Sequence, residues 1–231
     1  MCSFCYITEV LEDQRVATSI KAFIFDLDGV ITDTAEFHYL AWKQLAEEEG
    51  ISFTREDNEQ LRGVSRRESL NRMLKGRPID DVTANLWMER KNVYYKEFLH
   101  QITPDHALPG VPHFLTAARN AGILIGLGSA SKNARDVLER LELRNAFDAV
   151  GDGYSVVNSK PAADLFIWVA GRLNVTPQQA VVFEDAEAGV EAALTGGFWT
   201  VGIGSANVQK AHLLTDGIGS LNVETVISRM G

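Results

Sequence analysis

The stretch Lys21-Ala-Phe-Ile-Phe-Asp-Leu-Asp28 indicates the fold class of this 231-residue chain. Its apolar run is continuous rather than alternating, which is typical of a strand buried on both faces of a parallel sheet. Such a strand carries Asp26 at its carboxyl end, where ligands bind in open α/β sheets. Because side chains alternate along an extended chain, Asp26 and Asp28 are expected to lie on the same side.

The residues that follow this strand predict an all-helical insertion. Apolar residues recur at helical spacing from Phe37 to Leu45, and Gly50 ends that pattern as a C-terminal cap. The segment Ser65-Arg-Arg-Glu68 has the form of a capping box that opens another helix. A longer helix is then expected to contain Val82, Leu86, Val93, Tyr94 and Phe98. We therefore expect residues 34–106 to form a helical cap domain.

Strand and helix patterns alternate in the rest of the chain. Strands are expected at 123–127, 147–150, 180–183 and 198–201, with helices beginning near 132, 162 and 187 and a closing helix at 222–230. This alternation predicts a doubly wound, Rossmann-like α/β core with a parallel sheet, made of residues 19–33 and 107–231. Residues 1–18 are expected to be an N-terminal extension. Its Cys2-x-x-Cys5 pair has no second pair or nearby histidine, so we expect reduced thiols rather than a zinc site.

Composition excludes several classes of partner. The hydrophobic fraction of 45% is that of an ordinary soluble protein, and no apolar run approaches the roughly 20 residues that a membrane span needs. A net charge of -9 argues against sequence-independent binding of nucleic acid. The opening stretch lacks the basic start of a secretory signal. We expect a cytoplasmic, monomeric protein whose partner is a small molecule.

Polar residues at the predicted strand ends indicate phosphoryl transfer. Asp26 and Asp28 end the first strand, Ser129 ends the second, Lys160 precedes a helix, and Glu184-Asp185 ends a later strand. Clustered carboxylates repel one another unless a hard cation is present, and Mg²⁺ prefers oxygen ligands. Such a cation screens an attacking carboxylate from an anionic phosphate, while an ammonium and a hydroxyl can hold the phosphoryl oxygens. A lone Asp-x-Asp is common on protein surfaces, so the prediction depends on all four strand ends.

These motifs resemble a known superfamily. The segment Phe25-Asp-Leu-Asp-Gly-Val-Ile-Thr-Asp-Thr34, together with Ser129, Lys160-Pro161 and Glu184-Asp185, is similar to the four motifs of the haloacid dehalogenase superfamily, over Lys21 to Gly204. Within it, four further stretches resemble the β-phosphoglucomutase family: Asp33-Thr-Ala-Glu-Phe-His38, Gly63-Val-Ser-Arg-Arg-Glu-Ser69, Arg90-Lys-Asn92 and Gly128-Ser-Ala-Ser-Lys-Asn133.

The resemblance implies a role for each motif residue in the core. Asp26 would form an aspartyl-phosphate, and Asp28 would act as general acid and base on the sugar hydroxyl. Ser129 and Lys160 would hold the transferring phosphate. The Mg²⁺ ligands would be Asp26, the Asp28 carbonyl, Glu184 and Asp185. The implied activity interconverts β-D-glucose 1-phosphate and glucose 6-phosphate, with glucose 1,6-bisphosphate as intermediate and activator.

The resemblance also implies substrate contacts around the cap. The phosphate that is not transferred would be held by Arg66 of the cap and by the core loop Ala130, Ser131, Lys132 and Asn133. Four further residues would face the sugar or control access to Asp28: Thr34, His38, Ser69 and Lys91. Gly63 and Val64 would belong to the cap loop that closes over the sugar.

Some residues depart from the family pattern, and other interpretations stay open. Arg62 stands where a lysine is usual, Ala163 where a proline is expected, and Ala186 where a serine is expected. Without the resemblance, His38 would be read as a packed, half-buried histidine and Lys91 as a solvated helix residue; the position of His38 after Thr34 and Glu36 favours a role in the site. A sugar-phosphate phosphatase, in which water attacks the same aspartyl-phosphate, is the main alternative activity. A catalytically silent binding module on this fold is the other.

Overall fold

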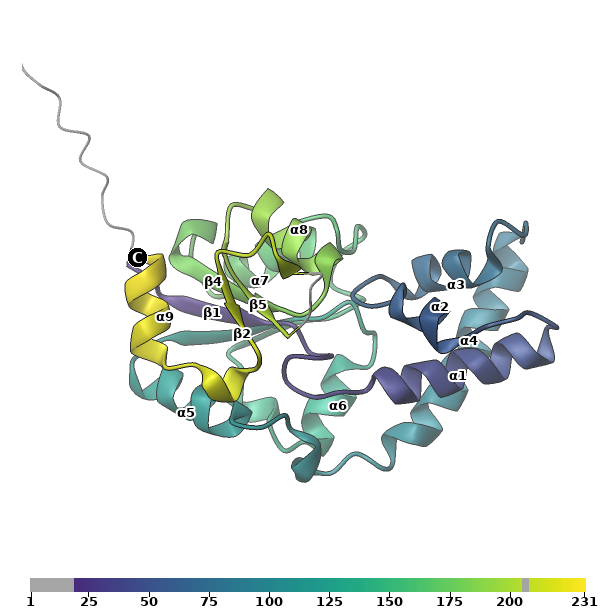
Figure 1. The fold of residues 1–231 in the computed structure, drawn as a ribbon, viewed down its shortest axis with the longest axis horizontal. Coiled ribbons are helices and arrows are strands. Elements are labelled where there is room, and N and C mark those ends of the chain that lie inside the picture. Colours follow the sequence, from purple (N-terminus) through teal and green to yellow (C-terminus); the bar gives the residue numbers. More distant parts are fainter. Residues whose placement is uncertain (1–18, 205–207) are drawn as a thin grey trace, which may run out of the picture.

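The computed structural model describes residues 19–204 and 208–231, so Cys2 and Cys5 lie outside the described residues. A sheet with flanking helices occupies one end of the molecule, and a group of helices without strands lies at the other end (Figure 1). Among the described residues, no helix has both the length and the hydrophobicity required to cross a bilayer.

The described residues form a six-stranded sheet in which every neighbouring pair is parallel. Its order is β3-β2-β1-β4-β5-β6. The strands are β1 (Ala22–Phe25), β2 (Leu124–Gly128), β3 (Ala149–Gly151), β4 (Ala180–Glu184), β5 (Trp199–Ile203) and β6 (Leu213–Thr215). The predicted doubly wound parallel sheet is therefore confirmed.

Helices cover both faces of the sheet because β1 is apolar on both sides. Phe23 and Phe25 pack with residues of α5 (Val111–Asn120), α6 (Ala134–Arg140) and α9 (Val223–Met230). Ala22 and Ile24 point to the opposite face and pack with α7 (Asp164–Arg172) and α8 (Glu187–Thr195). This alternation is the period of two that an extended strand imposes.

The helical group comprises α1 (Ala35–Glu48), α2 (Arg55–Glu59), α3 (Arg66–Leu74) and α4 (Asp81–Leu99). It has a core of its own around Trp42, Leu45, Leu70 and Met73. Tyr95 near the end of α4 packs instead with the hydrophobic cluster of the sheet. We call α1–α4 and their connections the cap; the residues at which the two units divide stay a prediction.

Local details differ from the sequence-based expectations in three places. Ser65 accepts a hydrogen bond from the Glu68 backbone N–H, but the Glu68 carboxylate pairs with Arg72, so only half of the capping box forms. The short elements α2 and β6 were not expected. The apolar residues Val82, Leu86 and Val93 lie on the exposed side of α4, and its buried side consists of Ala84, Lys91, Tyr95 and Leu99.

Chain order creates a crevice at one end of the sheet. The chain builds β1, β2 and β3 outward in one direction and then crosses to β4 on the other side of β1. The Asp26 N–H donates to the Phe183 carbonyl at 3.0 Å, so the two strand ends stay in register. Such a switch point is where ligands bind in doubly wound sheets.

Candidate active site

Three carboxylates meet at the carboxyl ends of β1 and β4. Asp26 follows β1 and is 4% exposed, and Glu184 is the fully buried last residue of β4. One oxygen from each of Asp26, Glu184 and Asp185 lies within 4.8 Å of the others. The structure thus brings together three of the four carboxylates expected at the strand ends, and the Asp28 carboxylate is not part of this group.

Two glycines make room for this cluster. A Cβ atom at Gly29, whose φ is +81°, would collide with the Asp185 carboxylate, and one at Gly189 would collide with the Glu184 carboxylate. Burial, and next the charge of Glu184, raises the pKa of Asp185 above its usual range. Oxygen donors crowded in this way suit a hard cation, because the cation removes their mutual repulsion. The residues present therefore fit Mg²⁺.

Lys160 neutralises part of the negative charge of this carboxylate cluster. Its Nζ lies 2.5 Å from Asp26 Oδ1 and also donates to Glu184 Oε1, and the side chain is fully buried. Burial alone would lower the pKa of Lys160, but the charges of Asp26 and Glu184 outweigh it and raise that pKa. Lys160 is therefore a fixed positive charge beside Asp26.

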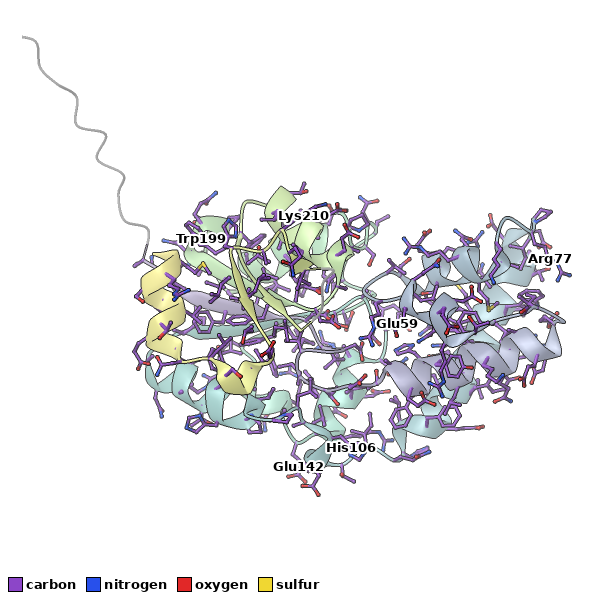
Figure 2. The ribbon with its side chains drawn as sticks, viewed as in Figure 1. Glu59, Arg77, His106, Glu142, Trp199 and Lys210 are labelled. Atoms are coloured by element: carbon purple, nitrogen blue, oxygen red, sulfur yellow. The ribbon has the colours of Figure 1, made fainter. Side chains whose placement is uncertain are left out.

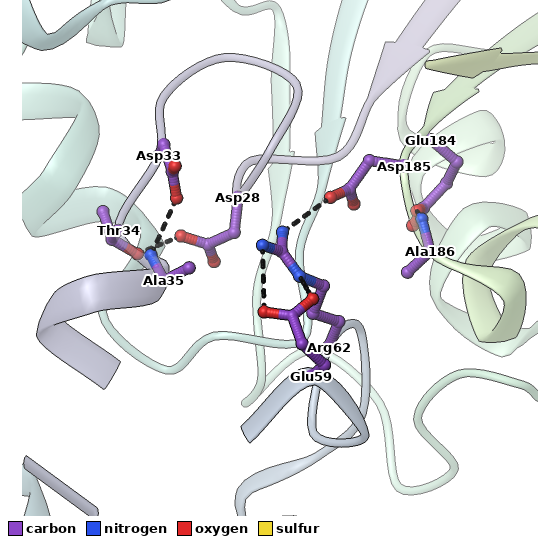
Figure 3. Close-up of polar contacts among 9 residues, drawn as sticks. All are labelled: Asp28, Asp33, Thr34, Ala35, Glu59, Arg62, Glu184, Asp185 and Ala186. Carbon is purple, nitrogen blue, oxygen red and sulfur yellow. Dashed lines mark hydrogen bonds and ion pairs between the residues drawn. The ribbon is translucent and has the colours of Figure 1, made fainter. Parts of the chain in front are cut away.

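Asp28 is suited to proton transfer near neutral pH. Burial and then the charge of Asp26 raise its pKa to about 7, although a hydrogen bond from Thr34 Oγ1 to Asp28 Oδ1 acts in the opposite direction. Figure 3 shows Thr34 beside Asp28 at the start of α1. Tyr95 Oη in turn donates to Thr34 Oγ1 at 3.3 Å. Tyr95 was not among the residues predicted for the site.

A buried lysine contacts a half-buried histidine on the cap side. Lys91 Nζ lies 2.8 Å from His38 Nδ1, and the direction of this hydrogen bond follows from the tautomer of the ring. Lys91 is 2% exposed, and its Nζ lies 5.0 Å from the Trp42 ring centroid and 4.6 Å from that of Tyr95. Burial, followed by the charge of Arg66, lowers the pKa of Lys91 well below its usual value.

The loop after β2 is held by its own hydroxyl groups. The Ser131 N–H donates to Ser129 Oγ at 3.1 Å, and the Asn133 N–H donates to Ser131 Oγ at 3.2 Å. Ser129 and Asn133 are buried, and Asn133 lies at the N-cap of α6. These two hydrogen bonds within the loop fix Ser129, Ser131 and Asn133 relative to one another.

Arg66 begins α3 and approaches this loop from the cap. Arg66 Nη2 donates to Asn92 Oδ1 at 2.9 Å, and Asn133 Nδ2 donates to the same oxygen at 3.0 Å. Burial lowers the pKa of Arg66, whose side chain is 11% exposed. Arg66 and Asn133 were predicted for one subsite, whereas Asn92 was not, although it belongs to the family-like segment Arg90-Lys-Asn92.

A second arginine links the cap to the carboxylate cluster. Arg62 Nη1 donates to Asp185 Oδ2 at 3.1 Å, and its Nε donates to Glu59 Oε2 at 2.8 Å (Figure 3). Figure 2 shows Glu59 where the cap meets the sheet unit, with Arg77 at the far end of the cap. The adjacent Gly63 has a φ of +70°, and a Cβ there would come 2.8 Å from the Ala186 Cβ. The cap loop is thus in direct contact with the end of β4.

One cavity between the cap and the sheet unit collects most of the predicted site residues. Its lining consists of Asp26, Asp28, Ala35, His38, Trp42, Asn58, Leu61, Arg62, Gly63, Val64, Arg66, Ser69, Lys91, Ser129, Ala130, Ser131, Lys132, Asn133 and Asp185. Three predicted residues do not line it: Thr34, Lys160 and Glu184. Thr34 donates to the lining residue Asp28 and Lys160 to the lining residue Asp26, while Glu184 accepts from Lys160. Trp42 and Asn58 were not predicted. Trp42 had a usable signal, since it lies one turn after His38 on the same helix.

Comparison with known proteins identifies the family. The model of the haloacid dehalogenase-like hydrolase family matches residues 20–197. The chain belongs to this family. It is 43% identical to the β-phosphoglucomutase of Bacillus subtilis over 80% of this chain and 84% of that protein. It is 30% identical to a phosphorylated carbohydrates phosphatase of Thermotoga maritima, over 90% of this chain and 97% of that one.

A solved structure supports the same assignment. The crystal structure of β-phosphoglucomutase from Clostridium difficile superimposes with a TM-score of 0.88 at 40% identity, covering 91% of this chain and 97% of that chain. The chain is therefore an enzyme of the haloacid dehalogenase superfamily that resembles phosphoglucomutases, and it carries an acidic cluster of the kind that suits the Mg²⁺ typical of the family.

Proposed function

We propose that this enzyme is a β-phosphoglucomutase that interconverts β-D-glucose 1-phosphate and glucose 6-phosphate. The observation that carries the proposal is that one cavity has a cationic side chain near it on the core side and another on the cap side. Asp26 lines the cavity at its base, the side formed by the sheet unit, and Lys160 is held against Asp26. Arg66 and Asn133 line the cavity where the cap reaches the core, and both donate to Asn92. A substrate with phosphates at both ends suits a cavity with a cationic group at each end.

In the proposed reaction Asp26 is the nucleophile. A carboxylate oxygen of Asp26 attacks the phosphorus of glucose 1,6-bisphosphate, the bond between phosphorus and the sugar oxygen breaks, and Asp28 gives its proton to that oxygen. In the return step Asp28 takes the proton from the other hydroxyl, which attacks the aspartyl-phosphate. A carboxyl with a pKa of about 7 is suited to both directions.

Charge at the base of the cavity would stabilise the transferring group. Lys160 is held against Asp26, and the Ser129 hydroxyl lies in the same cavity. We propose that Asp26, the Asp28 carbonyl, Glu184 and Asp185 hold Mg²⁺. When bound, this ion screens the repulsion between carboxylate and phosphate. Glucose 1,6-bisphosphate would serve as the activator that first phosphorylates Asp26.

The cap would exclude water and hold the sugar. His38 and Lys91 line the cavity from α1 and α4, and Gly63 and Val64 line it from the loop before α3. In the tautomer that carries its proton on Nε2, His38 would donate a hydrogen bond toward the cavity. Ser69 lines the cavity beside them, and its Oγ also donates to the Ser65 carbonyl at 3.0 Å. Shielding of the aspartyl-phosphate from water is what favours transfer over hydrolysis.

The test is an assay with β-D-glucose 1-phosphate, Mg²⁺ and a trace of glucose 1,6-bisphosphate. We expect glucose 6-phosphate to accumulate much faster than inorganic phosphate, and both products are measured in the same samples. Formation of inorganic phosphate without glucose 6-phosphate would reject the mutase.

That outcome would favour a sugar-phosphate phosphatase, the second candidate. It is supported by the 30% identity to the Thermotoga maritima phosphatase and by 32% identity to a fructose-1-phosphate phosphatase of Escherichia coli, over 78% of this chain and 94% of that one. Both candidates use the same nucleophile, so the identity of the acceptor, a sugar hydroxyl or water, separates them.

A further inference from the structure

The side-chain oxygen of Asn92 connects the cap to the core beside the cavity. Asn92 lies on α4, and its Oδ1 accepts from Arg66 Nη2 on α3 at 2.9 Å and from Asn133 Nδ2 at the start of α6 at 3.0 Å. Asn133 belongs to the core loop after β2, so this second bond crosses from the cap to the core. Both donor residues line the cavity, while Asn92 itself does not.

Arg66 lies in surroundings that leave its charge poorly balanced. Its side chain is 11% exposed, and among the described residues its only ion pair is a 3.9 Å approach to Glu89, which is 72% exposed. A pair at that distance with an exposed carboxylate contributes little. A mostly buried cation without a close counter-charge is costly unless a ligand supplies the anion. The position of Arg66 therefore indicates an anionic ligand in this part of the cavity.

We propose that Asn92 is a positioning residue for the phosphate that is not transferred: its amide oxygen holds Arg66 and Asn133 side by side so that both can donate to that phosphate. The inference rests on the proposed function, because it assigns a residue to the second phosphate site. An arginine carries five N–H groups and an asparagine amide two. Each donor residue therefore keeps N–H groups for a ligand while it is held by Asn92.

The neutral charge of the Asn92 amide distinguishes a residue that positions phosphate donors from one that only connects the cap to the core. A carboxylate at position 92 could accept the same two hydrogen bonds, and its bond to Arg66 would be stronger because it is charge-assisted. It would also neutralise Arg66 and repel a phosphate nearby. A residue that only fastens the cap would therefore tolerate Asn92→Asp, whereas a residue that positions phosphate donors would not.

The experiment compares Asn92→Asp and Asn92→Leu with Asn85→Asp, which places the same charge on an exposed position of the same helix. The KM for β-D-glucose 1-phosphate is measured with glucose 1,6-bisphosphate present. Hydrolysis of acetyl phosphate is measured in parallel, since this small donor has no second phosphate. Thermal unfolding verifies that each variant is folded.

We expect Asn92→Asp to raise the KM for the sugar phosphate by about tenfold or more, and Asn92→Leu by a smaller factor. Acetyl phosphate hydrolysis should stay within about twofold of wild type in both. The inference is overturned if the KM of Asn92→Asp matches that of Asn85→Asp, or if acetyl phosphate hydrolysis falls by the same factor. If the wild type only hydrolyses sugar phosphates, the proposed mutase fails, and the same KM comparison in the hydrolysis assay still tests Asn92.

Discussion

The guanidinium of Arg62 on the cap lies 3.1 Å from Asp185 Oδ2 at the end of β4 (Figure 3). Glu59 holds the same guanidinium from the cap side through Arg62 Nε, at 2.8 Å. Asp185 is also one of the three carboxylates of the acidic cluster. In this arrangement one carboxylate serves both the contact between cap and core and the proposed metal site.

This relationship predicts that Arg62 weakens metal binding. A guanidinium and a divalent cation compete for the same carboxylate, so Arg62→Ala should tighten Mg²⁺ binding several-fold in the absence of substrate, by on the order of 1 kcal/mol. Arg62→Lys should lie between the two, because an ammonium cannot contact Glu59 and Asp185 as a planar fork. Titration calorimetry with Mg²⁺ measures the affinity directly.

The control is Arg67→Ala, which removes a cap arginine that pairs with Asp81 on the surface. Its Mg²⁺ affinity should equal that of wild type. Equal affinities for Arg62→Ala and Arg67→Ala would show that Asp185 binds the ion without competition from Arg62.

The raised pKa of Asp28 predicts how stability depends on pH in the metal-free protein. Between the ordinary aspartate pKa of 3.8 and the folded value of about 7, the folded protein keeps a proton that the unfolded chain has lost. The free energy of unfolding should therefore fall as the pH rises from about 4 to about 7, and stay lowered above that. Asp28→Asn removes this loss and keeps an acceptor for Thr34.

Asp28→Asn should thus match wild type near pH 4 and exceed it at pH 8 by on the order of 2–4 kcal/mol, since cavity water screens part of the effect. Urea unfolding in excess chelator at a series of pH values measures this difference. Asp105→Asn, at an exposed position, is the control and should show no such trend. A difference that is constant with pH would contradict the assignment of a raised pKa to Asp28.

Strand-end residues could be predicted from the sequence because backbone geometry alone determines where they lie. A continuous apolar run predicts a buried parallel strand, and the carboxyl ends of adjacent parallel strands meet, so Asp26 and Glu184 had to approach each other. No packing detail is needed for this step. The same reasoning placed Ser129 at the end of β2.

Contacts of the cap could not be derived in this way. The face of α4 that is buried depends on how the helix packs against α1. The positions of its most apolar residues predict the wrong buried face, because Val82 and Leu86 are exposed while Lys91 and Tyr95 are buried. Burial of a lysine is unfavourable locally and occurs here because His38 and two aromatic rings surround it. Tyr95 and Asn92 were missed for the same reason, since their partners come from distant segments.

Asp26→Asn should abolish the covalent intermediate. An amide cannot act as the nucleophile, so incubation with acetyl phosphate and Mg²⁺ should phosphorylate wild type but not this variant. Asp28→Asn should still form the phosphoenzyme, because general acid–base catalysis acts on the sugar hydroxyl, while its turnover falls by about 10²–10⁴-fold. Intact-protein mass spectrometry at low temperature detects the added phosphate. A phosphoenzyme in Asp26→Asn would require a different nucleophile.

Lys91 is predicted to lower stability in exchange for function. Burial and the charge of Arg66 lower the pKa of Lys91, which means that its charged form is disfavoured in the folded state. Lys91→Met keeps a similar volume between the rings of Trp42 and Tyr95 and removes the cost of burying an ionisable amine. After the loss of the hydrogen bond to His38, the free energy of unfolding should still rise by about 1 kcal/mol, and the melting temperature by several degrees. The KM for the sugar phosphate should rise at the same time, because Lys91 lines the cavity.

Lys96→Met, at an exposed position on the same helix, is the control and should change neither the melting temperature nor the KM. A lower melting temperature for Lys91→Met would mean that the contacts of Lys91 outweigh the cost of burying its charge, and that its burial is a structural rather than a functional requirement.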